Sequence, residues 1–147
     1  MLDRAISEVS KYDGTSPSKV KTALVKHFGG ASSSTFASWI NVNLKYLRLV
    51  TPMSGFTCSP SSGSLCGSST LAVTIWCVPF VDVRICSPYY FSFPQEERSS
   101  TIIHEWAHKY GCNFDVAYDW QSKYDELSTF MQLLNADSFG EFVKDIQ

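Results

Sequence analysis

The chain has 147 residues, 44% of them hydrophobic and 18% charged, which fits one folded domain over residues 1–147 and excludes a disordered or collagen-like chain. Its formal charge of −2 argues against a nucleic-acid partner, because such affinity rests largely on neutralising phosphates. The longest apolar run, residues 71–83, is interrupted by Pro79 and is too short for a membrane span.

The first fifty residues predict three helices. Apolar side chains recur at helical spacing over residues 5–12. Pro17 suits the first turn of a second helix, whose apolar positions fall within residues 20–28 and which a pair of glycines ends. The serines at 32–34 can cap a third helix over residues 36–49.

The middle of the chain predicts a loop followed by short strands. Residues 51–70 are rich in Ser, Gly and Pro and carry no charge, so we expect a long loop. Residues 71–78 and 81–86 are rich in β-branched side chains, which predicts two strands, and Asp82 near the turn favours antiparallel pairing. The aromatic residues 89–93 fit a third strand or an extended segment.

The last third of the chain predicts three more helices. Pro94, followed by acidic side chains, predicts a helix that continues to about Tyr110 and ends at Gly111. Two further helices are expected over residues 120–134 and 138–146. Helices, then a small sheet, then helices together predict an α+β domain.

The five cysteines fit either redox compartment. No two of them have C-x-x-C spacing, which argues against a cysteine zinc cluster or a thioredoxin-like site. One interpretation pairs the first four in two disulfides, with Cys112 left over, and the other keeps all five reduced and buried. The sequence does not choose between them. The first four are Cys58, Cys66, Cys77 and Cys86.

His104, Glu105 and His108 form the pattern H-E-x-x-H on the helix that follows Pro94. Four residues turn a helix by about 400°, so the two imidazoles lie on one face and can bind the same metal ion. Zinc lowers the pKa of a bound water toward about 7, and Glu105, offset by one residue, can take its proton. A chain of this composition would contain the pattern by chance roughly 0.002 times, so we interpret it as a catalytic zinc site.

A catalytic zinc ion usually has a third protein ligand. The metzincin pattern requires a histidine six residues after His108, where Phe114 stands, and this excludes that class. A gluzincin would use a glutamate, and Glu126 and Glu141 are available. Asp115, just beyond the expected end of the helix, is close enough to fold back on the metal.

The segment after this helix resembles the signature of the aspzincin metallopeptidases, the group of deuterolysin and peptidyl-Lys metallopeptidase. Residues 111–119, GCNFDVAYD, are similar to the family pattern G-T-x-D-x-x-Y-G, and residues 135–139, NADSF, to its N-A-D-S-Y segment. Looser likenesses lie at residues 85–90 and 27–29. The resemblance is specific only in the last fifty residues.

The resemblance implies a zincin-like metallopeptidase fold with a small sheet beside the H-E-x-x-H helix. It implies one Zn²⁺ ion, with His104, His108 and Asp115 as ligands. Glu105 would be the general base. Tyr118 would donate a hydrogen bond to the oxyanion of the tetrahedral intermediate.

Substrate preference is the part of the resemblance that transfers least directly. In lysine-specific members the aspartate of the N-A-D segment, here Asp137, acts with an acid three residues on to bind the lysine after the scissile bond. Gly140 stands at that second position, with Glu141 beside it. Asp119 replaces the last glycine of the signature and can alter the turn, while Cys112-Asn113 replaces Gly-Thr. Residues 101–147 carry eight acidic against three basic side chains, so a lysine preference stays open.

Each accessory residue also has a purely structural interpretation. Asp115 can be a turn residue, Tyr118 a core aromatic and Asp137 the N-cap of the last helix. His27 suits the C-terminal end of a helix, where a cation is favourable, and Trp106 suits the core.

The sequence therefore predicts a zinc metalloendopeptidase that acts on a protein or peptide substrate as a monomer. The alternatives are a catalytically inactive zinc-binding interaction domain and a gluzincin-type peptidase with Glu126 as third ligand. The first residues lack the charged-then-apolar pattern of a signal sequence. We therefore expect a module of a larger secreted polypeptide, or a toxin or effector domain.

Overall fold

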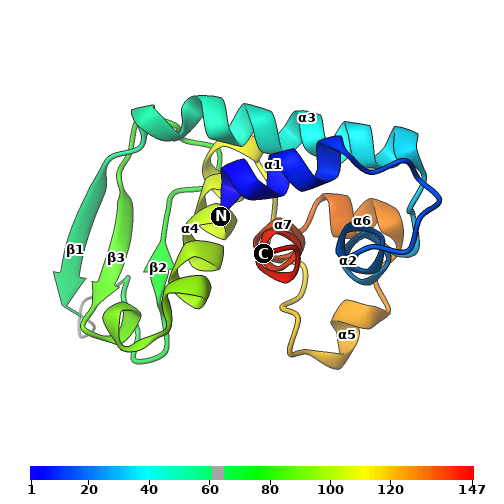
Figure 1. The fold of residues 1–147 in the computed structure, drawn as a ribbon. Helices are drawn as coiled ribbons and strands as arrows, with labels where there is room; N and C mark the ends of the chain where they lie inside the picture. The colour runs from blue at the N-terminus through cyan, green and yellow to red at the C-terminus, as the bar shows by residue number, and fades with distance from the viewer. Residues whose placement is uncertain (61–64) are drawn as a thin grey trace.

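The computed structural model describes residues 1–60 and 65–147 and has the expected α+β architecture (Figure 1). Over these residues there are seven α-helices, two 3₁₀-helices and three strands. None of the helices described is both long and apolar enough to cross a membrane. In chain order the elements are α1 (Leu2–Ser10), α2 (Lys19–His27), α3 (Ser34–Val50), η1 (Thr51–Met53), β1 (Phe56–Pro60), β2 (Ala72–Val73), β3 (Val83–Ser87), η2 (Tyr89–Ser92), α4 (Gln95–Gly111), α5 (Ser122–Asp125), α6 (Thr129–Leu133) and α7 (Ala136–Asp145).

The three N-terminal helices confirm the prediction, and α2 and α3 each begin with a serine cap. The hydroxyl of Ser18 accepts the Lys21 N–H at 3.1 Å and begins α2, so Pro17 precedes the cap and does not lie in the first turn. Ser33 caps α3 in the same way. Figure 1 shows α3 along one edge of the molecule, with α1 beside it and α7 and α2 below.

The sheet differs from the prediction because its pairing is partly non-local. Its order is β1-β3-β2, with β1 parallel and β2 antiparallel to β3. Residues 56–60 form β1, although a loop was expected over 51–70; this edge strand is largely exposed and shows no alternating pattern. The expected strand over 71–78 shortens to β2, and residues 89–93 form η2 instead of a strand. The part of the expected loop at 61–64 lies outside the described residues.

Two disulfides correct both interpretations of the cysteines. Cys66 pairs with Cys86 and Cys77 with Cys112, at Cα–Cα distances of 5.4 and 4.6 Å, within the usual range. Cys58 on β1 is the exposed, unpaired cysteine among the described residues. The interpretation that left Cys112 unpaired was therefore wrong. The Cys77–Cys112 bond ties the segment after β2 to the end of α4.

The main core lies between the helices, with Phe28 at its centre. Its ring meets those of Phe36, Phe139 and Phe142 edge-on at 5.4–5.9 Å. A smaller cluster under the sheet includes Val83 and Ile85 and contacts Trp106 of α4.

The helix expected over residues 120–134 is instead two short helices, α5 and α6, because Ser128 caps the start of α6.

Helices α4 and α7 approach closely at Gly140. A Cβ atom there would lie 2.9 Å from the carbonyl oxygen of Ser100 and 3.4 Å from the Cβ of His104. The absence of a side chain therefore brings the N-terminal half of α7 against the face of α4 that carries the histidines.

We expect Gly140→Ala to lower the free energy of unfolding by about 1–2 kcal/mol. The new methyl group meets a backbone oxygen, so the helices must separate, and this outweighs the gain in helix propensity of about 1 kcal/mol. Thermal and urea unfolding would measure the change. Gly67→Ala is the control, since its Cβ would meet only the Thr70 hydroxyl at 3.3 Å; an equally stable Gly140→Ala would contradict the tight contact.

Candidate metal centre

The two histidines of α4 point their Nε2 atoms at the same place. His104 and His108 lie one helical turn apart, and their Nε2 atoms are 2.9 Å from each other. Both side chains are buried. The helix geometry expected from their spacing is present.

Asp115 completes a three-residue group. Its Oδ1 lies 3.2 Å from the Nε2 of His104 and 3.2 Å from that of His108. Donor atoms of a tetrahedral zinc site, each about 2.0–2.1 Å from the ion, are separated by roughly 3.3 Å, close to these distances. Within residues 1–60 and 65–147 these three form the one group of His, Cys, Asp or Glu side chains whose ligand atoms converge in this way.

The outer nitrogens of the imidazoles fix their tautomers. Nδ1 of His108 lies 2.8 Å from the carbonyl oxygen of Asn113, which only accepts hydrogen bonds, so this nitrogen carries the proton. Nδ1 of His104 faces Oδ1 of Asp137 at 3.4 Å. Metal-binding histidines are held by acceptors in this way. The Nε2 lone pairs and the Asp115 carboxylate thus face one another, and this donor set fits a cation.

The charges around His104, His108 and Asp115 also favour a cation at this place. Burial lowers the pKa of His104, but hydrogen bonds to Asp115 and Asp137 outweigh it and raise that pKa to about 10. Burial raises the pKa of Asp115, yet the two histidines hold it well below its ordinary value. Without a metal ion, these interactions therefore favour the protonated form of His104.

Glu105 lies next to this group on α4 and lines the same cleft. Its side chain is buried, and burial raises its pKa, while His104 and His108 act in the opposite direction. A carboxylate of raised pKa is a stronger base.

The loop after α4 is held by the N-terminal end of α7. Asn135, fully buried, accepts the Val116 N–H at 3.0 Å and donates to the Ala117 carbonyl at 2.7 Å. Backbone hydrogen bonds between Phe114 and residues 134 and 136 hold the same loop, and together with Asn135 they form what we call the clamp. The sequence analysis gave Asn135 no role of its own, although it opens the N-A-D segment.

Asp137 does not cap α7, because Asn135 is the N-cap. Instead one carboxylate oxygen faces His104, and the other accepts the Asp119 N–H at 2.7 Å. The structural interpretation of Asp137 as an N-cap was therefore wrong.

Tyr118 lies flat against His104. Their ring centroids are 5.8 Å apart with planes inclined by 10°, and the rings of Tyr118 and Trp120 also stack, with centroids 5.6 Å apart. Burial, and next the negative charge of Asp115, raise the pKa of the phenol. Tyr118 therefore stays protonated and can donate a hydrogen bond.

A cleft in two halves runs past these residues. One half, about 370 Å³, is bordered by Trp76 and Phe114, whose rings stack at 5.0 Å. The other, about 410 Å³, is lined by Lys144 and, besides Glu105, by four acidic residues. Both halves include His104, Glu105 and Tyr118. The four acidic residues are Glu97, Asp119, Asp137 and Glu141.

The remaining candidates lie apart from the donor atoms. Glu126 ends α5, is exposed and does not line the cleft. Glu141 accepts a hydrogen bond from Ser100 and pairs with Lys144. His27 is buried away from the cleft, and its two ring nitrogens form hydrogen bonds with Tyr124 and Asp145.

No family model and no curated protein matches this chain. A solved structure described as a zinc peptidase from Grifola frondosa does match, with a TM-score of 0.72 over 97% of this chain and 85% of that one. The two sequences are 18% identical, so the likeness establishes the fold. The chain thus has a zinc-peptidase fold, as the resemblance to aspzincins led us to expect.

We expect Asn135→Ala to weaken zinc binding by about 10–100-fold, because the loop that carries Asp115 loses its buried side-chain clamp. Competition with a chromophoric chelator would measure the affinity. Asn43→Ala is the matched control, since Asn43 is only partly buried and its side chain donates to the Trp39 carbonyl within α3. Unchanged zinc affinity in Asn135→Ala would contradict the clamp.

We expect zinc affinity to rise about tenfold per pH unit between roughly pH 6.5 and 8.5, because the metal must displace one proton. In the metal-free protein the pKa of His104 is about 10, above its ordinary 6.5. The free energy that this proton contributes to folding is complete below about pH 6.5 and is lost as the pH rises through 10. Calorimetry in buffers of different ionisation enthalpy counts the released protons, and a flat pH profile would be inconsistent with this competition.

Proposed function

We propose that this protein is a zinc metalloendopeptidase whose ion is held by His104, His108 and Asp115. The observation that carries the proposal is the convergence of their three donor atoms at 2.9–3.2 Å. Nitrogen and carboxylate ligands suit Zn²⁺, and three protein ligands leave a position for water or substrate. The zinc-peptidase fold of the Grifola frondosa neighbour supports the same activity.

A zinc ion in this position would polarise the scissile carbonyl and acidify a water molecule. Glu105 would take the proton of the attacking water and deliver it to the leaving amine. The raised pKa of its buried carboxyl group suits both transfers. The Tyr118 phenol would donate to the oxyanion, and stacking on His104 holds its ring in place.

The edge of the sheet formed by β2 borders the cleft, and an extended peptide could lie along it. Strand β2 pairs with β3 on one side, and its residues Ala72 and Val73, with Thr74 after them, line the cleft. Main-chain hydrogen bonds to such an edge bind a peptide independently of its sequence. This supports cleavage within protein chains.

The acidic half of the cleft supports a preference for basic side chains. Lys144 pairs with Glu97 and Glu141 and so offsets their charge. The Asp119 carboxylate remains to face a substrate cation, and Asp137, which faces His104 and accepts the Asp119 N–H, adds negative charge beside it. We therefore propose that lysine is accepted here without the second family acid, whose position is Gly140.

The two disulfides favour an oxidising compartment. We accordingly propose that the protein acts outside the cytosol. Its delivery as a toxin, an effector or part of a larger secreted polypeptide stays a prediction.

We expect Glu105→Gln to retain zinc and to lose peptide cleavage by about 10²–10⁴-fold, because the amide cannot accept the proton of water. The assay is digestion of a denatured protein mixture with zinc, with and without a chelator, and cut sites read by mass spectrometry. Glu126→Gln should keep both zinc and activity. A wild-type protein that binds zinc but never cleaves would favour the inactive binding domain instead.

A further inference from the structure

Five large apolar side chains lie exposed along one face of α3 and the η1 turn that follows it. Their exposed fractions run from 47% for Trp39 to 76% for Leu49. The opposite face of α3 packs into the core through Ile40, Leu44 and Leu47. The helix therefore has a second apolar face, the α3 seam, that its own core does not use. The α3 seam consists of Trp39, Val42, Tyr46, Leu49 and Met53.

The spacing of the α3 seam is that of a helix-pairing surface. Successive members are three, four, three and four residues apart, which places them in the a and d positions of two heptads. Such a narrow seam fits another helix, whereas a helix that lies in a lipid interface has a broad apolar face.

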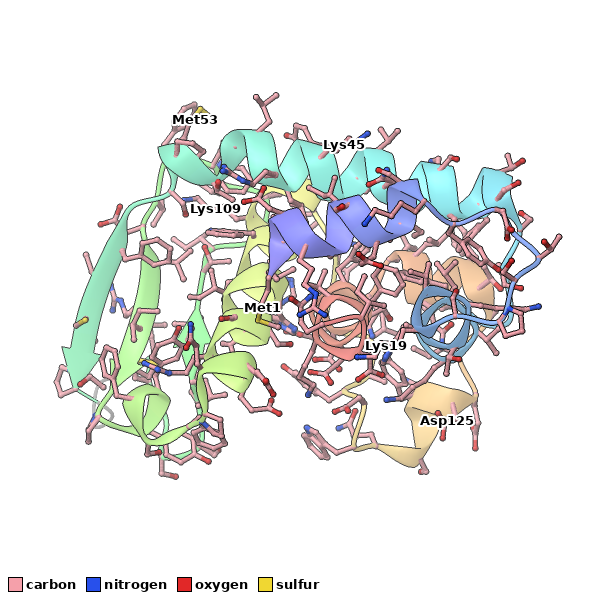
Figure 2. The ribbon with its side chains drawn as sticks, in the orientation of Figure 1. Met1, Lys19, Lys45, Met53, Lys109 and Asp125 are labelled. Atoms are coloured by element: carbon pink, nitrogen blue, oxygen red, sulfur yellow. A yellow bond between two sulfur atoms is a disulfide. The ribbon has the colours of Figure 1, made fainter. Side chains whose placement is uncertain are left out.

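The charges around the seam favour a second copy over a lipid surface. Helix α3 has no acidic residue, and its two basic residues are Lys45 and Arg48. Arg48 is already paired with Asp3 at 2.7 Å. Figure 2 shows Lys45 and Met53 on the side of α3 that faces away from the body of the protein. Anionic membranes are bound by clusters of about 4–8 basic residues, far more than one unpaired lysine.

We propose that the α3 seam binds the α3 seam of a second copy, with the two helices antiparallel. This orientation sets the bulky Trp39 against the flexible Met53 end, whereas a parallel pair would place tryptophan against tryptophan. The seam leaves roughly 600 Å² exposed per copy, so a pair buries about 1,200 Å², at the lower end of stable interfaces. The dimer is thus reversible, replaces the monomer expected from the sequence, and does not depend on the proposed catalytic function.

Sedimentation equilibrium of the full chain over about two decades of concentration tests the proposal. The measurement uses Cys58→Ser throughout, which removes the exposed thiol as a route to disulfide-linked dimers. We expect a monomer–dimer equilibrium that Leu49→Glu weakens by at least about tenfold, because a carboxylate enters the seam. Phe80→Glu is the matched control, since Phe80 is 95% exposed and lies outside the seam, and it should dimerise like the parent.

Cysteine cross-linking in the same background tests the orientation. A mixture of Trp39→Cys and Met53→Cys proteins should form mixed dimers, and Trp39→Cys alone should not cross-link to itself. Self-linking of Trp39→Cys would overturn the antiparallel arrangement. A monomer at every concentration, a dimer unaffected by Leu49→Glu, or binding of the monomer to phosphatidylserine vesicles through the seam would overturn the proposal itself.

Discussion

Three electron-pair donors that face one another across about 3 Å are the constraint on which this structure depends. Two imidazole nitrogens and a carboxylate oxygen repel at such distances unless a cation lies between them. In the metal-free protein the carboxylates of Asp115 and Asp137 favour the protonated form of His104 and so raise its pKa. A divalent ion would satisfy all three donors at once, and the fold holds these donors close together.

The fold achieves this mainly through one helix contact and one loop. Gly140 lets α7 approach α4 closely, so that the start of α7 reaches both His104 and the loop after α4. There Asn135 fixes the backbone beside Asp115, and Asp137 faces His104. The Cys77–Cys112 disulfide anchors the other end of the same loop. The candidate metal centre is therefore assembled by contacts between segments far apart in the chain.

The sequence predicted what depends on local spacing. His104 and His108 could be placed on one face because a helix has a fixed rotation per residue, and the helices around them had clear apolar periodicity and stop signals. Asp115 was reached through the resemblance and its short distance from the helix end. Most of what failed was non-local: the parallel pairing of β1, the choice of disulfide partners, and the contact of Asp137 with His104. These depend on tertiary packing that composition and periodicity do not encode. Two local features were also missed, the Ser128 cap that splits the helix expected over 120–134 and the 3₁₀-helix at residues 89–92.

The surroundings of the centre divide the cleft chemically. An aromatic half and an acidic half meet at His104, Glu105 and Tyr118, so a peptide that crosses the centre meets both. Lys144 pairs with Glu97 and Glu141 and offsets part of the acidic charge.

X-ray absorption spectroscopy of the zinc-loaded protein tests the central claim most directly, because it reads the ligands of the ion itself. The account requires two imidazole nitrogens and one carboxylate oxygen within about 2.0–2.2 Å and at least one exchangeable water. In Asp115→Ala the carboxylate contribution should disappear, while Glu126→Ala should leave the spectrum unchanged. A spectrum with four protein ligands, or one altered by Glu126→Ala and not by Asp115→Ala, would contradict it.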